Sequence, residues 1–596
     1  METRTWWKEG IVYQIYPRSF YDSNGDGTGD INGIRQKLDY LKDLGITILW
    51  LCPFYKSPDA DNGYDISNYE AVQPAFGTME DLSALIAEAH QRSIKIIIDL
   101  VINHTSCEHP WFLESRKSKK NDYSDFYIWR DGKDGNPPNN WGSVFSGSAW
   151  TYSQERGQYY LHLFTPQQPD LNWQNDTVRS ELFAMMDRWC RKGIDGFRMD
   201  VIGMISKPED FPDAPVRPGR IYGEWGSLIM NRPQVHTWLK EMNKNVLSKY
   251  DIATVGETAG VTTKDALQYA GFCAEELNMV FQFERPDAET ENGSKWTMKK
   301  AKLSVLKEIL SRWQNDLEGK AWNSLYWENH DQPRCVSRYG DTGRYWKESA
   351  KMLAVCLYMQ KGTPYIYQGQ ELGMTNTTFE KPGDLKDIEA VNAYNEMVHG
   401  RKISPALAMQ YINRISRDNA RTPFQWSDKP QAGFTSGTPW IPVNENYREI
   451  NAEKELHDPD SVLNFYKKII ELRKKHPEIV YGTYTLLMPE DEQLYIYTRQ
   501  LNNTKLLIVC NFTGEQVHAD IPQEFRDAPV LISNYGSVLS DHTTVRPYEG
   551  TVYSINNIVC QKWIITNLDA SVEVWSSLKV LQSGFNTPHT PQGAGY

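Results

Sequence analysis

Features that mark membrane-bound, secreted and nucleic-acid-binding proteins are missing from the sequence. No run approaches the ~18 consecutive apolar residues of a membrane-spanning helix, and the N-terminus lacks the apolar stretch of a secretory signal. The formal net charge of −12 argues against a nucleic-acid partner, which would require a basic surface patch. We therefore expect a cytoplasmic protein with neither a membrane nor a nucleic acid among its partners.

Cysteine is also sparse, because only eight are scattered through 596 residues, without a CxxC pair. This pattern favours reduced, buried thiols over a disulfide framework and argues against a zinc site. Aromatic residues, by contrast, make up 12% of the chain, with 20 Trp and 33 Tyr. Their faces can stack on sugar rings, although most of them should belong to hydrophobic cores. The chain is long enough for more than one domain.

Three carboxylates, Asp200, Glu257 and Asp331, each follow a strand-like run of small apolar or aromatic residues. The C-terminal ends of the strands of a (β/α)8 barrel converge on one face, so acids that are distant in sequence can meet there. An acid at a strand end is more often a helix cap or a surface residue, but Arg198 before Asp200 and His330 beside Asp331 strengthen the functional interpretation. Three acids predict chemistry on a glycosidic bond, with one carboxylate as nucleophile and a second as acid/base.

Short motifs accompany these acids along most of the chain. They are Asp99–His104, Gln168–Asn172, Gly196–Asp200, Gly256–Thr258, Asn329–Asp331, Gly362–Glu371 and 417–423. In type, order and spacing they resemble the α-amylase family of retaining glycoside hydrolases. The resemblance runs from about residue 6 to residue 555 and is closest to the oligo-1,6-glucosidase and α-glucosidase branch.

The resemblance implies a catalytic (β/α)8 TIM barrel with an inserted subdomain after the third strand and a C-terminal antiparallel β-sandwich. The barrel would comprise 1–104 and 174–479, with a further insertion at about 375–455 after the eighth strand. Subdomain B would span 105–173, whose irregular, aromatic-rich composition independently favours a functional insertion over disorder. The sandwich would span 480–557. For the atypical tail 558–596 we favour read-through sequence without a function over an extra binding element.

The resemblance also assigns roles to single residues. Asp200 would form a covalent glucosyl-enzyme, and Glu257 would be the acid/base, its pKa raised by a desolvated pocket and an ionised neighbour. Arg198 would keep Asp200 ionised and oriented, and Asp331 would hold the 2- and 3-hydroxyls of the sugar. The other implied contacts are the hydroxyl-binding His104, Gln168 and His330, the stacking Tyr64, the pocket-lining Phe164, and a clamp of Asp65 and Arg421 on the 4-hydroxyl. The clamp would dictate exo action, and plain core positions are the alternative for Tyr64 and Phe164.

The linkage preference is expected from the residue that follows the nucleophile. In the resembling branch, Val at this position accompanies α-1,6 preference and Thr accompanies α-1,4, and here the residue is Val201. Its side chain lacks a hydroxyl that would contact an α-1,4-linked second sugar. Lys295 and Glu389 resemble the residues that bind the second sugar in α-1,6-specific members, with ordinary solvated charges as the alternative.

The loop from residue 22 to residue 30 has the composition of a cation site. Oxygen-bearing side chains alternate with glycines, a pattern that suits a hard cation such as Ca²⁺. The predicted ligands are Asp22, Asn24, Asp26, Thr28 and Asp30. The loop is not an EF-hand, because Gly33 stands where the EF-hand has its Glu. We expect structural calcium, with an acidic surface turn as the alternative, and no organic cofactor.

Together these features predict a retaining, exo-acting α-glucosidase that removes glucose from short α-1,6-linked oligosaccharides. A sucrose isomerase or transglucosidase shares the framework and remains an alternative, as does an α-glucosidase of broader α-1,4/α-1,6 specificity. The segment Gln332–Gly340 is closer to the hydrolases than to the Arg-rich loop of isomerases. A non-catalytic ancillary subunit of an amino-acid transporter is a further alternative. Such subunits lose the catalytic acids and carry a membrane anchor, and this sequence shows neither change. We expect a monomer or weak homodimer acting on a small oligosaccharide.

Overall fold

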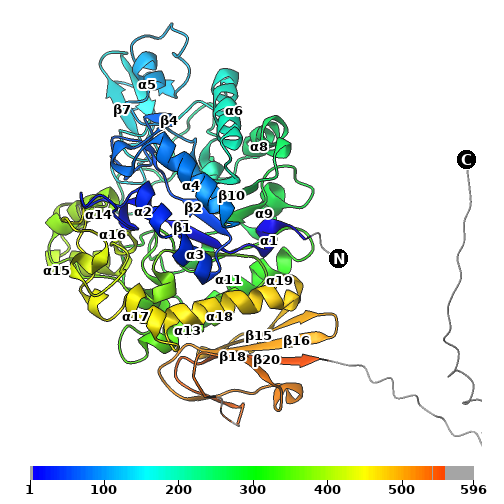
Figure 1. Ribbon diagram of the computed structural model, residues 1–596. Helices are drawn as coiled ribbons and strands as arrows, with labels where there is room; N and C mark the ends of the chain where they lie inside the picture. Colours follow the sequence, from blue (N-terminus) through cyan, green and yellow to red (C-terminus); the bar gives the residue numbers. More distant parts are fainter. Residues whose placement is uncertain (1–3, 538, 540, 557–596) are drawn as a thin grey trace, which may run out of the picture. The chain divides into compact units, whose positions relative to one another are not determined.

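A ring of eight parallel strands lies at the centre of the computed structural model, which describes residues 4–537, 539 and 541–556 (Figure 1). The hydrogen-bonded order is β11-β10-β9-β5-β2-β1-β13-β12. The strands are β1 (Val12–Ile15), β2 (Ile48–Leu51), β5 (Lys95–Val101), β9 (Gly196–Asp200), β10 (Ala253–Glu257), β11 (Met279–Phe281), β12 (Ser324–Tyr326) and β13 (Thr363–Tyr367). Ser324 Oγ donates to Val280 O at 2.7 Å, which joins the two ends of the sheet. The predicted TIM barrel is confirmed.

The strand β5 illustrates why these segments form a barrel. Every residue from Ile96 to Val101 is buried, without the alternation of a sheet that has one wet face. Ile96 and Ile98 belong to the large core beneath the outer helices. Ile97 points the other way, into the barrel interior, where it joins Trp50 and Phe281. The apolar run therefore fills both faces of one parallel strand.

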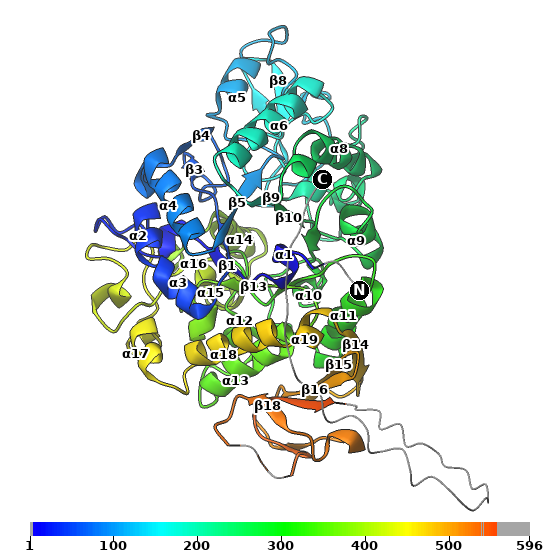
Figure 2. The same cartoon turned by 45° about the vertical axis from the view of Figure 1, so that its right-hand side comes forward.

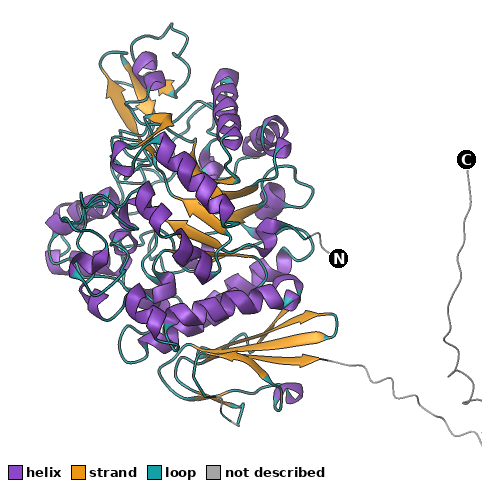
Figure 3. Cartoon of the chain, viewed as in Figure 1, coloured by secondary structure: helices purple, strands orange, loops and turns teal. Residues whose placement is uncertain are grey.

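Helices surround the strands (Figure 2), as the purple ribbons outside the orange barrel also show (Figure 3). α4 begins with a capping box in which the Thr78 and Asp81 side chains satisfy each other's backbone N–H groups. The main outer helices are α3 (Leu38–Leu44), α4 (Met79–Gln91), α6 (Asp176–Arg191), α8 (Pro233–Asn245), α9 (Thr263–Ala270), α11 (Leu303–Asp316), α13 (Trp346–Tyr358) and α18 (Val462–Lys475). None of the described helices combines the length and apolarity that crossing a bilayer demands.

Two insertions rise on the side of the barrel where the strands end. The first, predicted after the third strand, lies between β5 and α6. It contains α5 (Pro110–Ser115) and the antiparallel sheet β6-β8-β7, formed by β6 (Trp129–Arg130), β7 (Trp150–Ser153) and β8 (Gln158–Leu161). The second lies between β13 and α18 and contains α14 (Ile388–Asn395), α15 (Pro405–Ile415), α16 (Asp418–Arg421) and α17 (Ala452–His457). Figure 1 shows these two insertions in cyan and yellow-green.

The last described segment forms the expected C-terminal antiparallel sheet, in the order β14-β15-β16-β20-β18. Its strands are β14 (Thr483–Leu487), β15 (Leu494–Leu501), β16 (Thr504–Asn511), β18 (Val530–Ser533) and β20 (Gly550–Asn556), beside the two-stranded ladder of β17 (Val517–His518) and β19 (Thr544–Val545). Tyr497 OH donates to Cys356 O at 2.8 Å, which ties the sheet to α13. The predicted tail 558–596 lies outside the described residues.

Candidate active site

Arg198 lies at the centre of a cluster of acids on three neighbouring barrel strands. In the ladders, Arg198 of β9 is the register partner of Asp99 on β5 and of Val255 on β10. One of its terminal nitrogens lies 2.5 Å from Asp99 and 2.7 Å from Asp200, and the other lies 2.6 Å from Glu257. The guanidinium is 1% exposed. Asp99, to which the sequence analysis gave no separate role, therefore helps Arg198 to hold both predicted catalytic acids.

The two predicted catalytic acids differ in how strongly they retain a proton. Burial raises the pKa of Glu257 to about 7, against the opposing charge of Arg198 and with a further rise caused by Asp200. Burial also raises the pKa of Asp200 to about 6, again opposed by Arg198. Between these values Glu257 holds the proton and Asp200 is ionised. This order suits an acid/base and a nucleophile respectively.

Val201 connects the end of β9 to Glu257 through its backbone. Its N–H donates to Glu257 Oε2 at 3.1 Å. The residue has φ 38° and ψ 36°, a left-handed conformation that a β-branched side chain rarely adopts. Such conformations persist where the surroundings dictate them, and they cluster at functional sites. Val201 thus has a backbone role beside the acid/base in addition to its predicted role in linkage preference.

A second cluster forms where the loops after β2 and β12 meet. Tyr64 OH lies 2.6 Å from His330 Nε2, and the two rings stack with centroids 5.3 Å apart. The other ring nitrogen of His330 lies 2.7 Å from Gln14 Nε2. Burial lowers the pKa of His330, against the opposing charge of Asp331. Tyr64 also donates to Asp99 Oδ2 at 3.2 Å, which joins this cluster to the acids around Arg198.

The third predicted acid, Asp331, is surrounded by positive groups. Arg421 donates to its Oδ1 at 3.0 Å and Arg417 at 3.3 Å. His330 Nε2 lies 3.2 Å from its Oδ2. Burial alone would raise the pKa of Asp331, but His330 and Arg417 hold it well below its usual range. Asp331 is therefore a fixed anion, as a residue that binds sugar hydroxyls should be.

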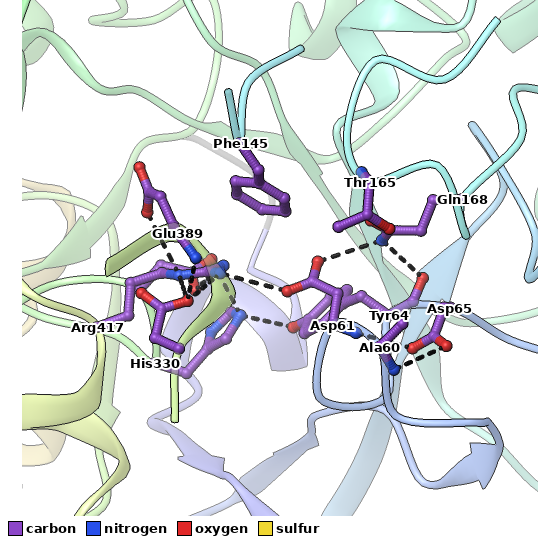
Figure 4. Close-up of polar contacts among 12 residues, drawn as sticks. Ala60, Asp61, Tyr64, Asp65, Phe145, Thr165, Gln168, His330, Glu389 and Arg417 are labelled. Atoms are coloured by element: carbon purple, nitrogen blue, oxygen red, sulfur yellow. Dashed lines mark hydrogen bonds and ion pairs between the residues drawn. The ribbon is translucent and has the colours of Figure 1, made fainter. Parts of the chain in front are cut away.

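The predicted clamp of Asp65 and Arg421 requires a correction. Asp65 is fully buried, and its carboxylate accepts bonds from Ser57 Oγ, Ala60 N and Asp61 N at 2.9, 3.0 and 3.1 Å. It therefore stabilises its own turn, and it is not Asp65 that Arg421 contacts but Asp331. The structure instead pairs Asp61 with Arg417, at 3.2 Å between Oδ1 and a terminal nitrogen (Figure 4).

The other predicted sugar contacts surround this pair. Gln168 Nε2 donates to Asp61 Oδ2 at 3.1 Å and lies 3.2 Å from His104 Nε2. Phe164 lies against His104, with ring centroids 5.2 Å apart. Phe145, which no motif pointed to, packs against Phe164 and stands over the Arg417 guanidinium at 4.9 Å (Figure 4).

The two charges predicted to bind the second sugar meet at the edge of this site. Lys295, from the loop after β11, lies 2.6 Å from Glu389 Oε2 at the start of α14. The same oxygen lies 3.5 Å from Arg417 Nε. Asp387 caps α14 and also lies 2.5 Å from Arg417. A continuous chain of charges therefore runs from Lys295 through Glu389 and Arg417 to Asp61.

The loop from residue 22 to residue 30 is closed by its own hydrogen bonds. Asp22 accepts from the N–H groups of Gly25 and Gly27 at 2.7 and 2.8 Å, and Asp30 caps α2 (Ile31–Gln36). Throughout residues 4–537, 539 and 541–556, no three His, Cys, Asp or Glu side chains are gathered as a metal site would require. Asp26 and Asn24 still present oxygen atoms with the chemistry of a hard-cation ligand. Calcium binding therefore stays a prediction.

Comparison with known proteins decides the family. The model of the alpha amylase catalytic domain matches residues 14–482. The oligo-1,6-glucosidase of Parageobacillus thermoglucosidasius is 55% identical over 557 residues, which cover 93% of this chain and 99% of that protein. The chain belongs to the alpha-amylase family.

Further relatives within the alpha-amylase family carry several different names. The oligo-1,6-glucosidase of Bacillus cereus is 53% identical over 93% of this chain and 100% of its own length. The crystal structure of a trehalose-6-phosphate hydrolase from Bacillus licheniformis is 49% identical, with a TM-score of 0.87, and covers 93% of this chain and 100% of its own. An isomaltulose synthase from Erwinia rhapontici NX5 is 42% identical, with a TM-score of 0.90 and the same coverage. The fold alone therefore does not separate hydrolases from isomerases in this family.

Proposed function

We propose that the protein is an exo-acting oligo-1,6-glucosidase that releases glucose from short α-1,6-linked oligosaccharides with retention of configuration. The observation that carries this proposal is the contact of Lys295 with Glu389 beside Arg417, combined with Val201 after the nucleophile. Relatives named oligo-1,6-glucosidase, at 55% and 53% identity over nearly their full length, support it.

The residues around Arg198 supply the chemistry. Asp200 attacks the anomeric carbon while Glu257 protonates the leaving glycosidic oxygen, which gives a covalent glucosyl-enzyme. Glu257, now ionised, takes a proton from water, and the water oxygen displaces Asp200 from the anomeric carbon. Arg198 contacts both acids and therefore stabilises each ionised form in turn. Two displacements at one carbon return the original anomeric configuration.

The pocket around Asp61 and Arg417 takes the terminal glucose. Both side chains are buried, and the adjacent Asp331, His330 and His104 supply further partners for sugar hydroxyls. Because Asp61 and Arg417 pair across the pocket, they block continuation of the chain beyond that glucose. We infer exo action from this closure, with Asp61 and Arg417 in the role that sequence reasoning gave to Asp65 and Arg421.

The experiment that tests the function compares isomaltose, maltose, sucrose and trehalose 6-phosphate as substrates and resolves the products by chromatography. We expect glucose from isomaltose with the highest kcat/KM, and initial release of the α-anomer in proton NMR spectra. Isomaltulose formed from sucrose would identify an isomerase instead. Asp200→Asn and Glu257→Gln should each lower turnover by several orders of magnitude in a folded protein, and a folded variant with near-wild-type activity would refute the mechanism.

We further propose a structural calcium ion at the loop from residue 22 to residue 30, and a cytoplasmic monomer or weak homodimer. The calcium proposal rests on the oxygen donors of Asp22, Asn24 and Asp26 in a glycine-rich loop. Among the described residues, the carboxylates of Asp22 and Asp30 bond to the loop itself, to α2 and to Thr435 rather than to the three acids, so the ion would stabilise the fold without entering the reaction.

A further inference from the structure

The loop 143–147 carries Phe145 over the sugar pocket. Within the first insertion the loop is fixed, because Phe145 packs against Phe164 and Ser143 Oγ donates to Phe164 O at 2.6 Å. On the side that faces α14, a cavity of about 190 Å³ lies against the loop; it is lined by Ser143, Phe145 and Ser146, by Ile388 and Asn392, and by Ala60 and residues 165–167. Side chains that face a void lose the dispersion contacts that a packed neighbour would supply. Towards α14, the position of the loop therefore depends on its polar contacts.

Two polar contacts cross from the second insertion to this loop. Asn392 Nδ2, on α14, donates to the carbonyl oxygen of Phe145 at 2.8 Å. Ser146 Oγ donates to Glu396 Oε2 at 3.1 Å. Glu396 begins a short π-helical turn, Glu396–Gly400, that directly follows α14. Such turns are frequent at functional sites.

Glu396 also contacts a third segment of the chain. Arg220, from the loop that follows β9, lies 3.0 Å from its Oε1, and Arg401 lies 2.6 Å from the same oxygen. Ser146 itself has φ 79°, which a residue other than glycine adopts only where its surroundings hold it. The side chain of Glu396 is 39% exposed, so these contacts are individually weak and can open and close.

We propose that Asn392 and Glu396 form a latch that holds the loop 143–147 closed. The closed loop keeps Phe145 over the pair of Arg417 and Asp61, and this closure sets the affinity for the terminal glucose. The assignment rests on the proposed function in one respect, because it takes the pocket at Arg417 and Asp61 as the glucose site. Asn392 and Glu396 are positioning residues, because they act through Phe145. The ring of Phe145 lies 4.9 Å from the Arg417 guanidinium.

Latch variants should change binding without changing the chemistry. Asn392→Asp removes the N–H donor at constant size, and Glu396→Gln removes the charge shared by Ser146 and Arg220. For each we expect KM for isomaltose and the inhibition constant of glucose to rise about 3- to 10-fold, as the loss of ordinary hydrogen bonds predicts. The value of kcat should stay within about twofold, because Arg198 and its acids are untouched.

Asn395→Asp is the matched control. Its exposed side chain lies on the same helix and makes no hydrogen bond to the loop 143–147 within the described part of the chain. It should leave KM, the glucose inhibition constant and the melting temperature unchanged. Glu396→Gln differs from the wild type by one charge only, so it keeps the test available if Asn392→Asp does not fold.

A chromogenic p-nitrophenyl α-glucoside separates this inference from the proposed function. Glucose inhibition of its hydrolysis reports on the glucose pocket whichever disaccharide is the natural substrate. A wild type that prefers maltose overturns the linkage assignment, and a raised glucose inhibition constant in the variants would still support the latch. Folded Asn392→Asp and Glu396→Gln proteins with unchanged KM and unchanged glucose inhibition would overturn the latch, as would a fall in kcat at constant KM.

Discussion

Lys295 Nζ lies 2.6 Å from Glu389 Oε2, although 94 residues separate the two along the chain. One comes from the loop after β11 and the other from the first turn of α14. The pair stands beside Arg417, so it forms the edge of the pocket next to the terminal glucose site.

Removing either charge should reduce the use of isomaltose. Lys295→Met and Glu389→Gln should each lower kcat/KM for isomaltose about 10-fold, which corresponds to about 1.4 kcal/mol of transition-state stabilisation. The double variant should lose little more than the worse single variant, because the two groups act as one unit. The measurement is a double-mutant cycle on isomaltose with maltose as the control substrate. Fully additive losses, or equal losses on both substrates, would contradict a shared role in linkage preference.

The pH dependence of kcat/KM should be bell-shaped, with limbs near pH 6 and pH 7. Below its pKa of about 6, Asp200 takes up a proton and no longer acts as the nucleophile. Above its pKa of about 7, Glu257 loses the proton that the leaving oxygen requires. Activity therefore falls on both sides of a maximum between the two values. Rates from pH 4 to pH 9 on isomaltose check this profile.

The same profile has an internal control. In Glu257→Gln, assayed with a p-nitrophenyl glucoside whose leaving group needs no protonation, the alkaline limb should disappear and the acid limb should remain. Persistence of the alkaline limb in this variant would assign it to another group.

Asp61 and Asp65 should respond differently to the same substitution. Asp61→Asn weakens the contact with Arg417 at the glucose pocket and should raise KM about 10-fold or more, since hydrogen bonds to charged groups contribute about 1.5–3 kcal/mol. Asp65→Asn replaces a buried acceptor of three internal bonds and should lower the melting temperature by several degrees instead. Steady-state kinetics and thermal melts of both proteins make the comparison. The reverse pattern would restore Asp65 as the clamp.

Val201→Thr should shift the linkage preference towards maltose. The new hydroxyl adds one hydrogen bond to an α-1,4-linked second sugar, and a neutral bond contributes about 0.5–1.5 kcal/mol. The ratio of kcat/KM for maltose to that for isomaltose should therefore rise roughly threefold to tenfold. Both residues are β-branched, so the backbone conformation at φ 38° gains no new strain. An unchanged ratio would remove Val201 as the determinant and leave the glucosidase function intact.

Calcium should stabilise the protein without affecting catalysis. An ion that binds only the folded state raises its stability, so chelation or Asp26→Ala should lower the melting temperature more than it lowers activity at 25 °C. Asp26 is exposed, and its loss alone should not disturb the core. Thermal melts with added calcium and with chelator are the measurement. Identical melting curves in both conditions would refute a metal site.

The barrel and the catalytic acids were predictable because each depends on local sequence. Strands buried on both faces appear as uninterrupted apolar runs, as from Ile96 to Val101, and the acids directly follow such runs. The short strand β11 had no comparable signal, because it spans only Met279–Phe281.

The proposed clamp of Asp61 and Arg417 differs from the predicted one because the deciding information is tertiary. Asp61 and Asp65 lie four residues apart on one loop, and Arg417 and Arg421 lie one helical turn apart at α16, so each predicted residue is a near neighbour of the proposed one. Which acid faces the pocket depends on the bonds of Asp65 to Ser57 and Ala60, which no spacing reveals. The latch at Glu396 likewise joins residues 146, 220 and 401, which share no motif.

Arg198 joins its three acids from consecutive strands, β5, β9 and β10, whereas Lys295, Glu389 and Arg417 come from loops after β11 and β13. Most of the proposed linkage determinants therefore lie outside the strands that carry the acids, and Val201, beside the nucleophile, is the exception. Changes in these loops can therefore alter substrate choice without changing the strands that carry the acids. A protein 42% identical, with a TM-score of 0.90, is named an isomaltulose synthase, so one scaffold carries two differently named activities.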